Sequence, residues 1–336
     1  MTTLPPSSNG PSASPDGDPF AWFAQSFRAV QDNVEIVIRG KAEVVHLALV
    51  CLLAEGHLLV EDVPGVGKTS LARSLATSIG STWHRIQFTP DLLPSDVTGV
   101  SIFDQKTQEF VFHPGAVFAN IVVGDEINRA SPKTQSALLE VMEERQVTVD
   151  GVAYPVNRPF MVIATQNPID MDGTYRLPEA QMDRFLMRSR IGYPDLDAEV
   201  EVLAAQRGGR SAIDRLLPVI SVDDARLLIA VANDVYVAAA IQRYIAAVVQ
   251  ATRTVEGVRL GASPRGSVGL LRASRARAAA VSREYVIPED VQHLAEHVLA
   301  HRIILRPEAE LRGLTGAEVV RTAVSSVPVP VQRAGG

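Results

Sequence analysis

The chain has 336 residues, 46% of them hydrophobic and 21% charged, which indicates a soluble globular protein with about two domains. Its net charge of −6 disfavours a broad contact with nucleic-acid phosphates, and its single cysteine, Cys51, excludes an internal disulfide. The N-terminus lacks the basic and apolar stretches of a secretory signal, and the apolar runs are too short to span a bilayer. We therefore expect a cytoplasmic protein with no membrane span.

The first half of the chain predicts a disordered start followed by an α/β core. Residues 1–19 are rich in Pro, Ser, Gly and Asp, a composition typical of disorder. Helical spacing of apolar residues predicts two helices, from Phe20 to about Val34 and over 42–54. Buried strands are predicted at 57–63, 84–88, 120–126 and 160–166, with helices at 70–80 and 131–145 between them. Strands that alternate with helices imply a parallel sheet covered on both faces.

Two hairpins and a helical second domain complete the predicted architecture. Alternating residues predict hairpins over 101–117 and 145–160, the second with the turn dipeptide Asp150-Gly151 at its tip. After residue 195 nearly all of the sequence has helical patterns, and the predicted helices are 197–206, 222–232, 236–255, 264–280 and 288–303. We therefore predict an α/β core over 20–195 and a helical domain over 196–336.

The stretch EDVPGVGKTS, residues 61–70, lies between a predicted strand and a predicted helix, which is the context of a phosphate-binding loop. The pattern G-x-x-x-x-G-K-[ST] has glycine where this chain has Asp62, although aspartate also tolerates turn conformations. Glycines in such a loop aim backbone N–H groups at phosphate, and the lysine reaches the same group. The residues predicted to bind ATP are Pro64, Gly65, Val66, Gly67, Lys68, Thr69 and Ser70. The alternative is an incidental Gly-Lys turn.

Polar residues follow two other predicted strands. In NIVVGDEINR the acids Asp125 and Glu126 end an apolar strand. Asp125 would hold Mg²⁺, as would the Thr69 hydroxyl, and Glu126 would polarise a water for attack on the terminal phosphate. Asn167, in ATQNP, would lie between these strand ends and orient that water. The alternatives are a strand followed by solvated acids, and a simple Asn-Pro turn.

These residues resemble the AAA+ ATPases, and closely the MoxR family within them, over about residues 35–330. The motifs that carry the resemblance are LLVEDVPGVGKTSLA, FTPDLLPSDVTG, GDEINRASPKTQSALLEVMEERQVTVDG, ATQNP, YRLPEAQMDRF and GASPRG. MoxR-like sequences commonly carry Glu-Asp-Val-Pro-Gly before Gly-Lys-Thr. Asp62 therefore departs from the general loop but agrees with this family, which favours an ATP site. The fold that the resemblance implies is α/β, an AAA+ P-loop core with a parallel sheet followed by an all-α helical lid.

The resemblance also implies roles for single residues. Lys68 and Thr69 match the Walker A residues of the family, and Asp125 and Glu126 match its Walker B pair. Asn167 matches its sensor 1 residue. These roles agree with the chemistry inferred from the residues themselves. The resemblance also places residues 34–41 where such proteins usually contact adenine.

Two arginines far from the loop receive a role from the resemblance alone. Arg184, in MDRF, matches the arginine finger, which completes the ATP site of the neighbouring subunit. Arg265, in GASPRG, matches sensor 2 on the lid, which would tilt with nucleotide state. Guanidinium groups neutralise the charge that spreads over a transferring phosphoryl group. The alternatives are a surface pair of Asp183 with Arg184, and a local salt bridge of Arg265.

The activity that the resemblance implies is hydrolysis of ATP with Mg²⁺ by a homo-oligomeric ring, expected to be a hexamer. MoxR-like proteins are linked to chaperone-like remodelling of protein clients or to metal-cofactor insertion, often with a partner that carries a von Willebrand factor A domain. The alternatives are a magnesium-chelatase-type motor subunit, a nucleic-acid motor and a nucleotide-gated binding protein. The acidic composition and the few basic residues of the second hairpin, Arg145 and Arg158, argue against nucleic acid.

Three histidines share one stripe of a predicted helix. His293, His297 and His301 are spaced four apart in HLAEHVLAH, and two of them would suffice for part of a metal site. No acidic or cysteine partner stands out beside them in the sequence. We therefore interpret them as structural or exposed histidines.

Overall fold

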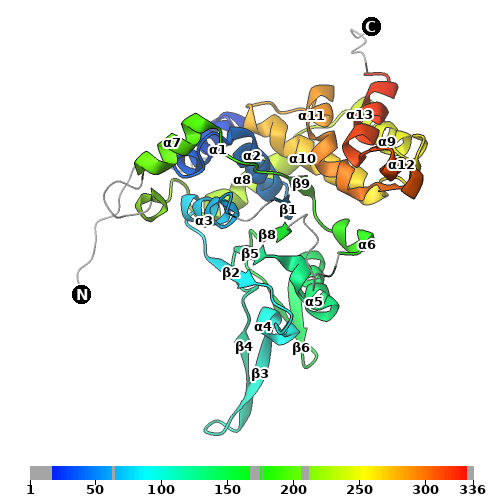
Figure 1. The fold of residues 1–336 in the computed structure, drawn as a ribbon. Helices are drawn as coiled ribbons and strands as arrows, with labels where there is room; N and C mark the ends of the chain where they lie inside the picture. The colour runs from blue at the N-terminus through cyan, green and yellow to red at the C-terminus, as the bar shows by residue number, and fades with distance from the viewer. Residues whose placement is uncertain (1–16, 63–64, 167–174, 176, 206–211, 331–336) are drawn as a thin grey trace.

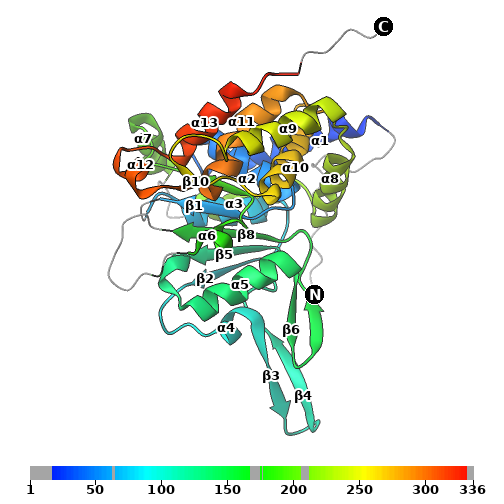
Figure 2. The ribbon, with the colours of Figure 1, turned by 90° about the vertical axis from the view of Figure 1, so that its right-hand side faces the viewer.

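The computed structural model describes residues 17–62, 65–166, 175, 177–205 and 212–330 (Figure 1). A layer of helices lies on one side of a central sheet, and two β-hairpins extend from the opposite side (Figure 2). The sheet has five strands in the order β2-β5-β8-β1-β9, and all neighbouring strands are parallel. Its strands are β1 (Leu58–Glu61), β2 (Trp83–Gln87), β5 (Ile121–Asp125), β8 (Met161–Gln166) and β9 (Met187–Ser189).

The predicted parallel sheet is therefore confirmed, with one strand that the sequence does not reveal. β9 has three residues, Met187 to Ser189, and it pairs with the outer side of β1. Its middle residue, Arg188, is charged and lies 3.3 Å from the Glu61 carboxylate of β1. A strand this short, with an arginine at its centre, has no apolar periodicity for sequence analysis to detect.

Alternate residues of the central strands pack against different layers of the molecule. Leu58, Ile121 and Ile163 face the core shared with the helical layer, and Leu59 and Val122 face the core beneath α5 (Pro132–Glu144). All five are fully buried. Strands of a parallel sheet with both faces covered read as continuous apolar runs, which is why the sequence reveals them.

The helical layer contains helices from both the N-terminal and the C-terminal parts of the sequence. Helix α10 contacts α1 and α2 from the N-terminal region as well as α8, α9 and α11, so one hydrophobic core extends across both of the predicted domains. None of the helices in the described ranges combines the length and apolar character needed to cross a bilayer. The helices of this layer are α1 (Pro19–Glu35), α2 (Ala42–Leu53), α8 (Val222–Asp234), α9 (Ala239–Ala251), α10 (Pro264–Ala280), α11 (Pro288–Leu299) and α13 (Gly316–Ser326).

The remaining elements are short or connect these layers. The region after residue 195 is helical as predicted, and it also contains one short antiparallel pair of strands, β10 with β11. These elements are α3 (Lys68–Ser78), α4 (Pro94–Thr98), α6 (Glu179–Met182), α7 (Leu196–Ala205), α12 (Pro307–Leu311), β10 (Val258–Leu260), β11 (Ile304–Leu305) and the 3-10 turns Ile127–Arg129, Ala212–Arg215 and Ala300–Arg302.

Both predicted hairpins are present. The first consists of β3 (Gly99–Asp104) and β4 (Glu109–Pro114), and the second of β6 (Gln146–Val149) and β7 (Val152–Pro155). Asp150 and Gly151 both have positive φ, as their position in a tight hairpin turn requires. The rings of Phe112 and Tyr154 stack with centroids 4.0 Å apart and join the two hairpins.

The fold predicts a large loss of stability for Phe88→Ala. Phe88 is fully buried between Gly124 and the core beneath α5. Removing its ring leaves a cavity, so we expect the free energy of unfolding in urea to fall by about 3–5 kcal/mol. Phe103→Ala, in the exposed hairpin, is the control and should cost about 1 kcal/mol or less. Equal losses in the two variants would contradict this packing.

Candidate nucleotide site

The predicted phosphate-binding loop has the expected strand-loop-helix context. β1 ends at Glu61, and α3 begins at Lys68. Gly65 and Gly67 have φ angles of 88° and 93°, which side chains disfavour, and Gly67 caps the N-terminus of α3. Helix N-termini carry unpaired N–H groups and attract phosphate. Of the predicted loop residues, Pro64 lies outside the described part of the chain.

The loop borders a cavity of about 320 Å³ at the carboxyl edge of the sheet. In open parallel sheets, ligands bind at this edge. The lining residues are Gly65, Gly67, Lys68, Thr69 and Ser70 from the loop, and Arg85, Gln87, Asp125, Glu126 and Thr165 from the strand ends. The structure thus brings the predicted Walker A residues and both predicted Walker B acids to one cavity.

Lys68 and Asp62 show how the loop is held. The Lys68 ammonium donates to the Asp62 carbonyl oxygen at 2.6 Å. Burial lowers the pKa of Lys68 from its usual 10.5, and the carboxylates of Asp62, Asp125 and Glu126 oppose that shift. The Asp62 carboxylate accepts a hydrogen bond from the Gly192 backbone N–H. A side chain at this position, where the general pattern has glycine, therefore ties the start of the loop to the segment after β9.

Asp125 is the most connected acid of the cavity. Its side chain is 8% exposed, and its Oδ2 atom accepts from the Thr69 hydroxyl at 3.1 Å and from the Arg85 Nε at 2.6 Å. The Thr165 hydroxyl donates to the other carboxylate oxygen at 3.2 Å. The hydroxyl of Thr69 and the carboxylate of Asp125 are hard oxygen donors held close together, which fits Mg²⁺. Such a site is completed by phosphate oxygens and waters, since Mg²⁺ usually takes one or two protein ligands.

Glu126 leaves the strand in a left-handed conformation, with φ of 58°. Its N–H donates to the Thr165 hydroxyl at 2.9 Å, and its carboxylate lies 3.1 Å from the Arg129 Nε. Such a conformation is uncommon outside glycine and needs support from its surroundings. The Thr165 hydroxyl supplies that support and places Glu126 at the cavity rather than along the strand.

Three residues that line this cavity, Arg85, Gln87 and Thr165, were not predicted, and two predicted residues, Pro64 and Asn167, lie outside the described part of the chain. Arg85 lies at an exposed position of β2, and Thr165 is buried within β8. The alternation of β2 could have shown that Arg85 faces outward, but no motif marks any of the three residues. Asn167 lies outside the described residues, directly after β8. Its sensor role stays a prediction.

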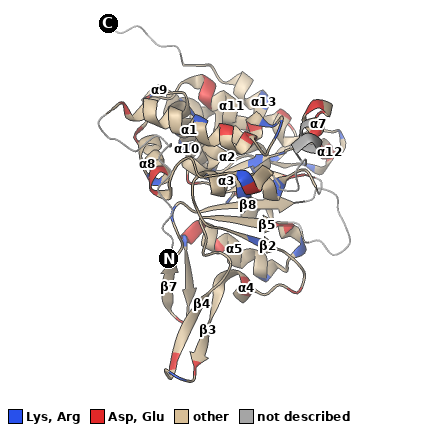
Figure 3. Cartoon of the chain, turned by 90° about the vertical axis from the view of Figure 1, so that its left-hand side faces the viewer, with Lys and Arg blue, Asp and Glu red and all other residues tan. Residues whose placement is uncertain are grey.

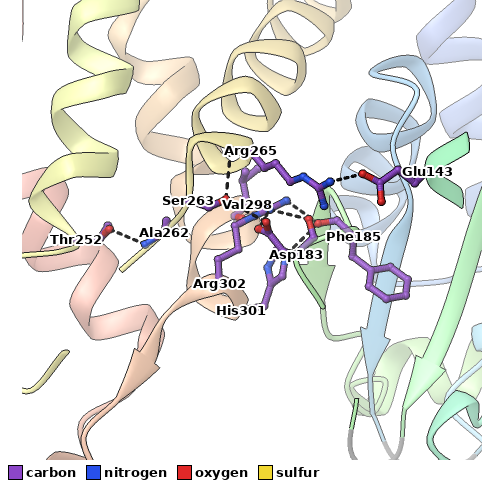
Figure 4. A network of polar contacts seen from close by, with 10 residues as sticks. All are labelled: Glu143, Asp183, Phe185, Thr252, Ala262, Ser263, Arg265, Val298, His301 and Arg302. Carbon is purple, nitrogen blue, oxygen red and sulfur yellow. Dashed lines mark hydrogen bonds and ion pairs between the residues drawn. The ribbon is translucent and has the colours of Figure 1, made fainter. Parts of the chain in front are cut away.

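The two predicted distal arginines line a different cavity, of about 430 Å³, and neither lines the loop cavity. Both pair with Glu143 in the last turn of α5. The Arg184 Nε lies 3.2 Å from Oε2 of Glu143. Arg265 bonds Oε1 of the same carboxylate (Figure 4). The structure thus brings together two arginines that are far apart in the sequence. The alternative of a surface pair between Asp183 and Arg184 does not form, because Arg184 pairs with Glu143 and Asp183 with Arg302.

A buried polar network fixes the backbone that carries these arginines. Asp183 pairs with Arg302 and accepts from the Ser263 hydroxyl at 3.0 Å (Figure 4). Arg302 also donates to the Phe185 carbonyl oxygen at 2.7 Å, and its side chain is 3% exposed. Ser263 caps α10, which carries Arg265. The network therefore ties the segment before β9 to the start of α10.

The three histidines of α11 and the turn after it contact different partners. His293 lies 2.9 Å from the Glu43 carboxylate, and His301 bonds the Phe185 carbonyl oxygen at 3.1 Å. Burial lowers the pKa of His301 well below its usual value. His297 lies 3.4 Å from the Arg188 carbonyl oxygen. These contacts support the structural interpretation.

Comparisons with known proteins give the family. Two family descriptions match, "ATPase family associated with various cellular activities (AAA)" over residues 57–187 and "AAA lid domain" over 250–323. YeaC of Bacillus subtilis is 52% identical over 302 residues, 90% of this chain and 94% of YeaC. Chaperone MoxR1 of Mycobacterium tuberculosis is 42% identical over 307 residues, 89% of this chain and 81% of MoxR1. The crystal structure of a Cytophaga hutchinsonii protein proposed to be an ATPase has a TM-score of 0.87 and 37% identity, covering 93% of this chain and 97% of that one.

The fold and the matched families define the class: a parallel sheet with a phosphate-binding loop, followed by a helical lid, is an AAA+ ATPase. Within that class the chain belongs to the MoxR family, because MoxR1 is 42% identical over most of both chains. The resemblance inferred from the sequence is confirmed, and with it the activity of the class, hydrolysis of ATP.

The buried network predicts a marked loss of stability for Arg302→Met. The substitution leaves the Asp183 carboxylate and the Phe185 carbonyl oxygen without their buried partner. Breaking a buried pair in this way costs about 3–5 kcal/mol, measured as the free energy of unfolding in urea. Arg321→Met, which breaks an exposed pair with Glu296, is the control and should cost about 1 kcal/mol or less. A loss from Arg302→Met no larger than the control's would show that the network does not hold the lid.

Proposed function

We propose that this ATPase binds Mg-ATP at the Gly65–Ser70 loop and couples its hydrolysis to chaperone-like remodelling or maturation of partner proteins. One observation carries the catalytic part of the proposal. Lys68 and Thr69 of the loop meet Asp125 and Glu126 at one cavity of about 320 Å³. Phosphoryl transfer requires a cation that binds phosphate, oxygen donors that bind a metal, and a carboxylate that activates water. This cavity contains all three kinds of group.

Each of these groups has a separate task. The backbone N–H groups at the start of α3 and the Lys68 ammonium bind the phosphates. Thr69 and Asp125 hold Mg²⁺, which neutralises charge on the phosphates when it is bound. Glu126 orients the attacking water and accepts its proton. Asn167, which the sequence places after β8, helps to orient the same water.

The distal arginines serve the ATP of the neighbouring subunit in a homo-oligomeric ring, most simply a hexamer. Arg184 and Arg265 line one cavity, and the loop residues line another, which supports a site shared between two subunits. Because both arginines pair with Glu143, we assign both to the same neighbouring phosphate, rather than Arg265 to its own subunit. An arginine supplied in this way can raise the hydrolysis rate by about 10³–10⁵-fold.

The similarity to a chaperone, MoxR1, supports protein remodelling as the biological function. We propose that the protein acts in the cytoplasm. A partner with a von Willebrand factor A domain follows from the family resemblance. The second hairpin argues against a nucleic-acid motor, because its Arg145 and Arg158 lie 2.6 and 3.7 Å from the Glu55 carboxylate. In Figure 3, acidic and basic residues are interspersed over the helical layer and around the sheet, which does not suit a phosphate backbone.

We expect Lys68→Ala and Glu126→Gln to affect different steps. Lys68→Ala removes a charge-assisted contact, so the Kd for ATP should rise about tenfold or more. Glu126→Gln should bind ATP normally but lower kcat by about 10²–10⁴-fold, because the amide cannot accept a proton. Lys106→Ala, in the exposed first hairpin, is the control for both measurements.

Normal hydrolysis by Glu126→Gln would show that the water is activated by another residue.

The same variant tests whether the ATPase acts on proteins. Protein clients should co-purify with its ATP-bound form and leave on exchange for ADP. A preparation in which DNA, and not protein, stimulates hydrolysis would instead favour a nucleic-acid motor.

The shared site predicts complementation between inactive subunits. Lys68→Ala damages one side of an interface and Arg184→Ala the other. In rings that contain both variants, some interfaces join an intact loop to an intact arginine. Mixing the two should therefore restore ATPase activity that neither variant has alone. If rings shown to contain both variants stay inactive, the arginine does not act across the interface.

A further inference from the structure

Glu143 receives two arginines on one carboxylate. Its Oε1 bonds Arg265 from the start of α10, and its Oε2 bonds the Nε of Arg184 at 3.2 Å. The three side chains come from different parts of the chain, and all line the same cavity of about 430 Å³. Two guanidinium groups that bind the same carboxylate lie close enough to repel each other, and the negative charge between them offsets that repulsion.

The end of α5 is anchored, which fixes the place of this carboxylate. Arg145 follows α5 in a left-handed conformation, with φ of 54°. Its guanidinium bonds the Glu55 carboxylate at 2.6 Å and the Glu55 carbonyl oxygen at 3.2 Å. Arg272 of α10 donates to the same carbonyl oxygen at 2.9 Å. Glu143 is therefore presented from a rigid helix end.

The contacts with Glu143 leave most donors of both arginines available. A guanidinium has five N–H groups. Arg184 uses its Nε, and Arg265 uses one terminal nitrogen. The remaining N–H groups can bond the oxygens of a phosphoryl group while Glu143 still holds each side chain.

The pairing contributes little to folding. The side chains of Glu143, Arg184 and Arg265 are 34%, 29% and 52% exposed. Ion pairs this accessible to water stabilise proteins weakly. The ion pairs act instead by orienting the two arginine side chains. Orientation matters because a displacement of about 1 Å in a catalytic group can lower the rate about 10²-fold.

We propose that Glu143 is a positioning residue that holds Arg184 and Arg265 as a pair aimed at one phosphoryl group of the neighbouring subunit's ATP. The inference rests on the shared site proposed above and adds a third residue to the side that donates the arginines. Glu143 does not touch the nucleotide. Without it, the two guanidinium groups separate and reach the phosphate in turn rather than together.

The kinetic test is Glu143→Ala in the full-length chain. We expect kcat to fall about 10- to 100-fold, because the arginines lose their common anchor. KM for ATP should stay within about threefold, because the binding loop is untouched. The midpoint of urea unfolding should be unchanged. Glu140→Ala, one turn earlier on the exposed side of α5, is the matched control and should keep normal kcat. A loss of kcat equal to the control's, or a shifted unfolding midpoint, would overturn the assignment.

Complementation tests the assignment independently. Glu143→Ala mixed with Lys68→Ala should regain activity, and mixed with Arg184→Ala it should not, because those two lesions lie on the same side of each interface. Recovery with Arg184→Ala, or none with Lys68→Ala, would overturn the positioning role. The pair Lys68→Ala with Arg184→Ala is measured in parallel. Its failure would refute the shared site itself, so the two failures are distinguishable.

Discussion

The hydrogen bond between the Thr69 hydroxyl and the Asp125 carboxylate is the contact on which the proposed nucleotide site depends. Thr69 lies in the first turn of α3 and Asp125 ends β5, so this 3.1 Å contact fixes the phosphate-binding loop against the carboxyl edge of the sheet. Arg85 and Thr165 also donate to the Asp125 carboxylate and hold its orientation. Glu126, turned out of the strand by Thr165, then lies at the same cavity.

A second polar centre lies on the other cavity and organises the arginines. The pair of Asp183 with Arg302 joins the segment before β9 to the lid. The carboxylate of Glu143 then joins the side chains of Arg184 and Arg265. The lid and the core are also packed through one hydrophobic core. Motion driven by hydrolysis is therefore expected between subunits more than between the two parts of one chain.

Patterns of adjacent residues in the sequence made much of the fold and of the binding loop predictable. The continuous apolar strands, the Gly65–Ser70 loop and the Asp150-Gly151 turn each carry their signal in a few adjacent residues, and the structure has all three. Contacts between distant segments were not predictable in the same way. Glu143 has the same local context as other acids of α5, and only the packed lid distinguishes it. β9 was missed because three residues with a central arginine have no periodicity.

The central claim is that ATP bound by one subunit is cleaved with arginines from the next. The most direct test is the ATPase rate per subunit as a function of protein concentration, with assembly followed by light scattering in the same samples. The account predicts that turnover rises with assembly and is nearly absent where the protein is monomeric. Turnover by strictly monomeric protein as fast as by the assembled form would contradict it.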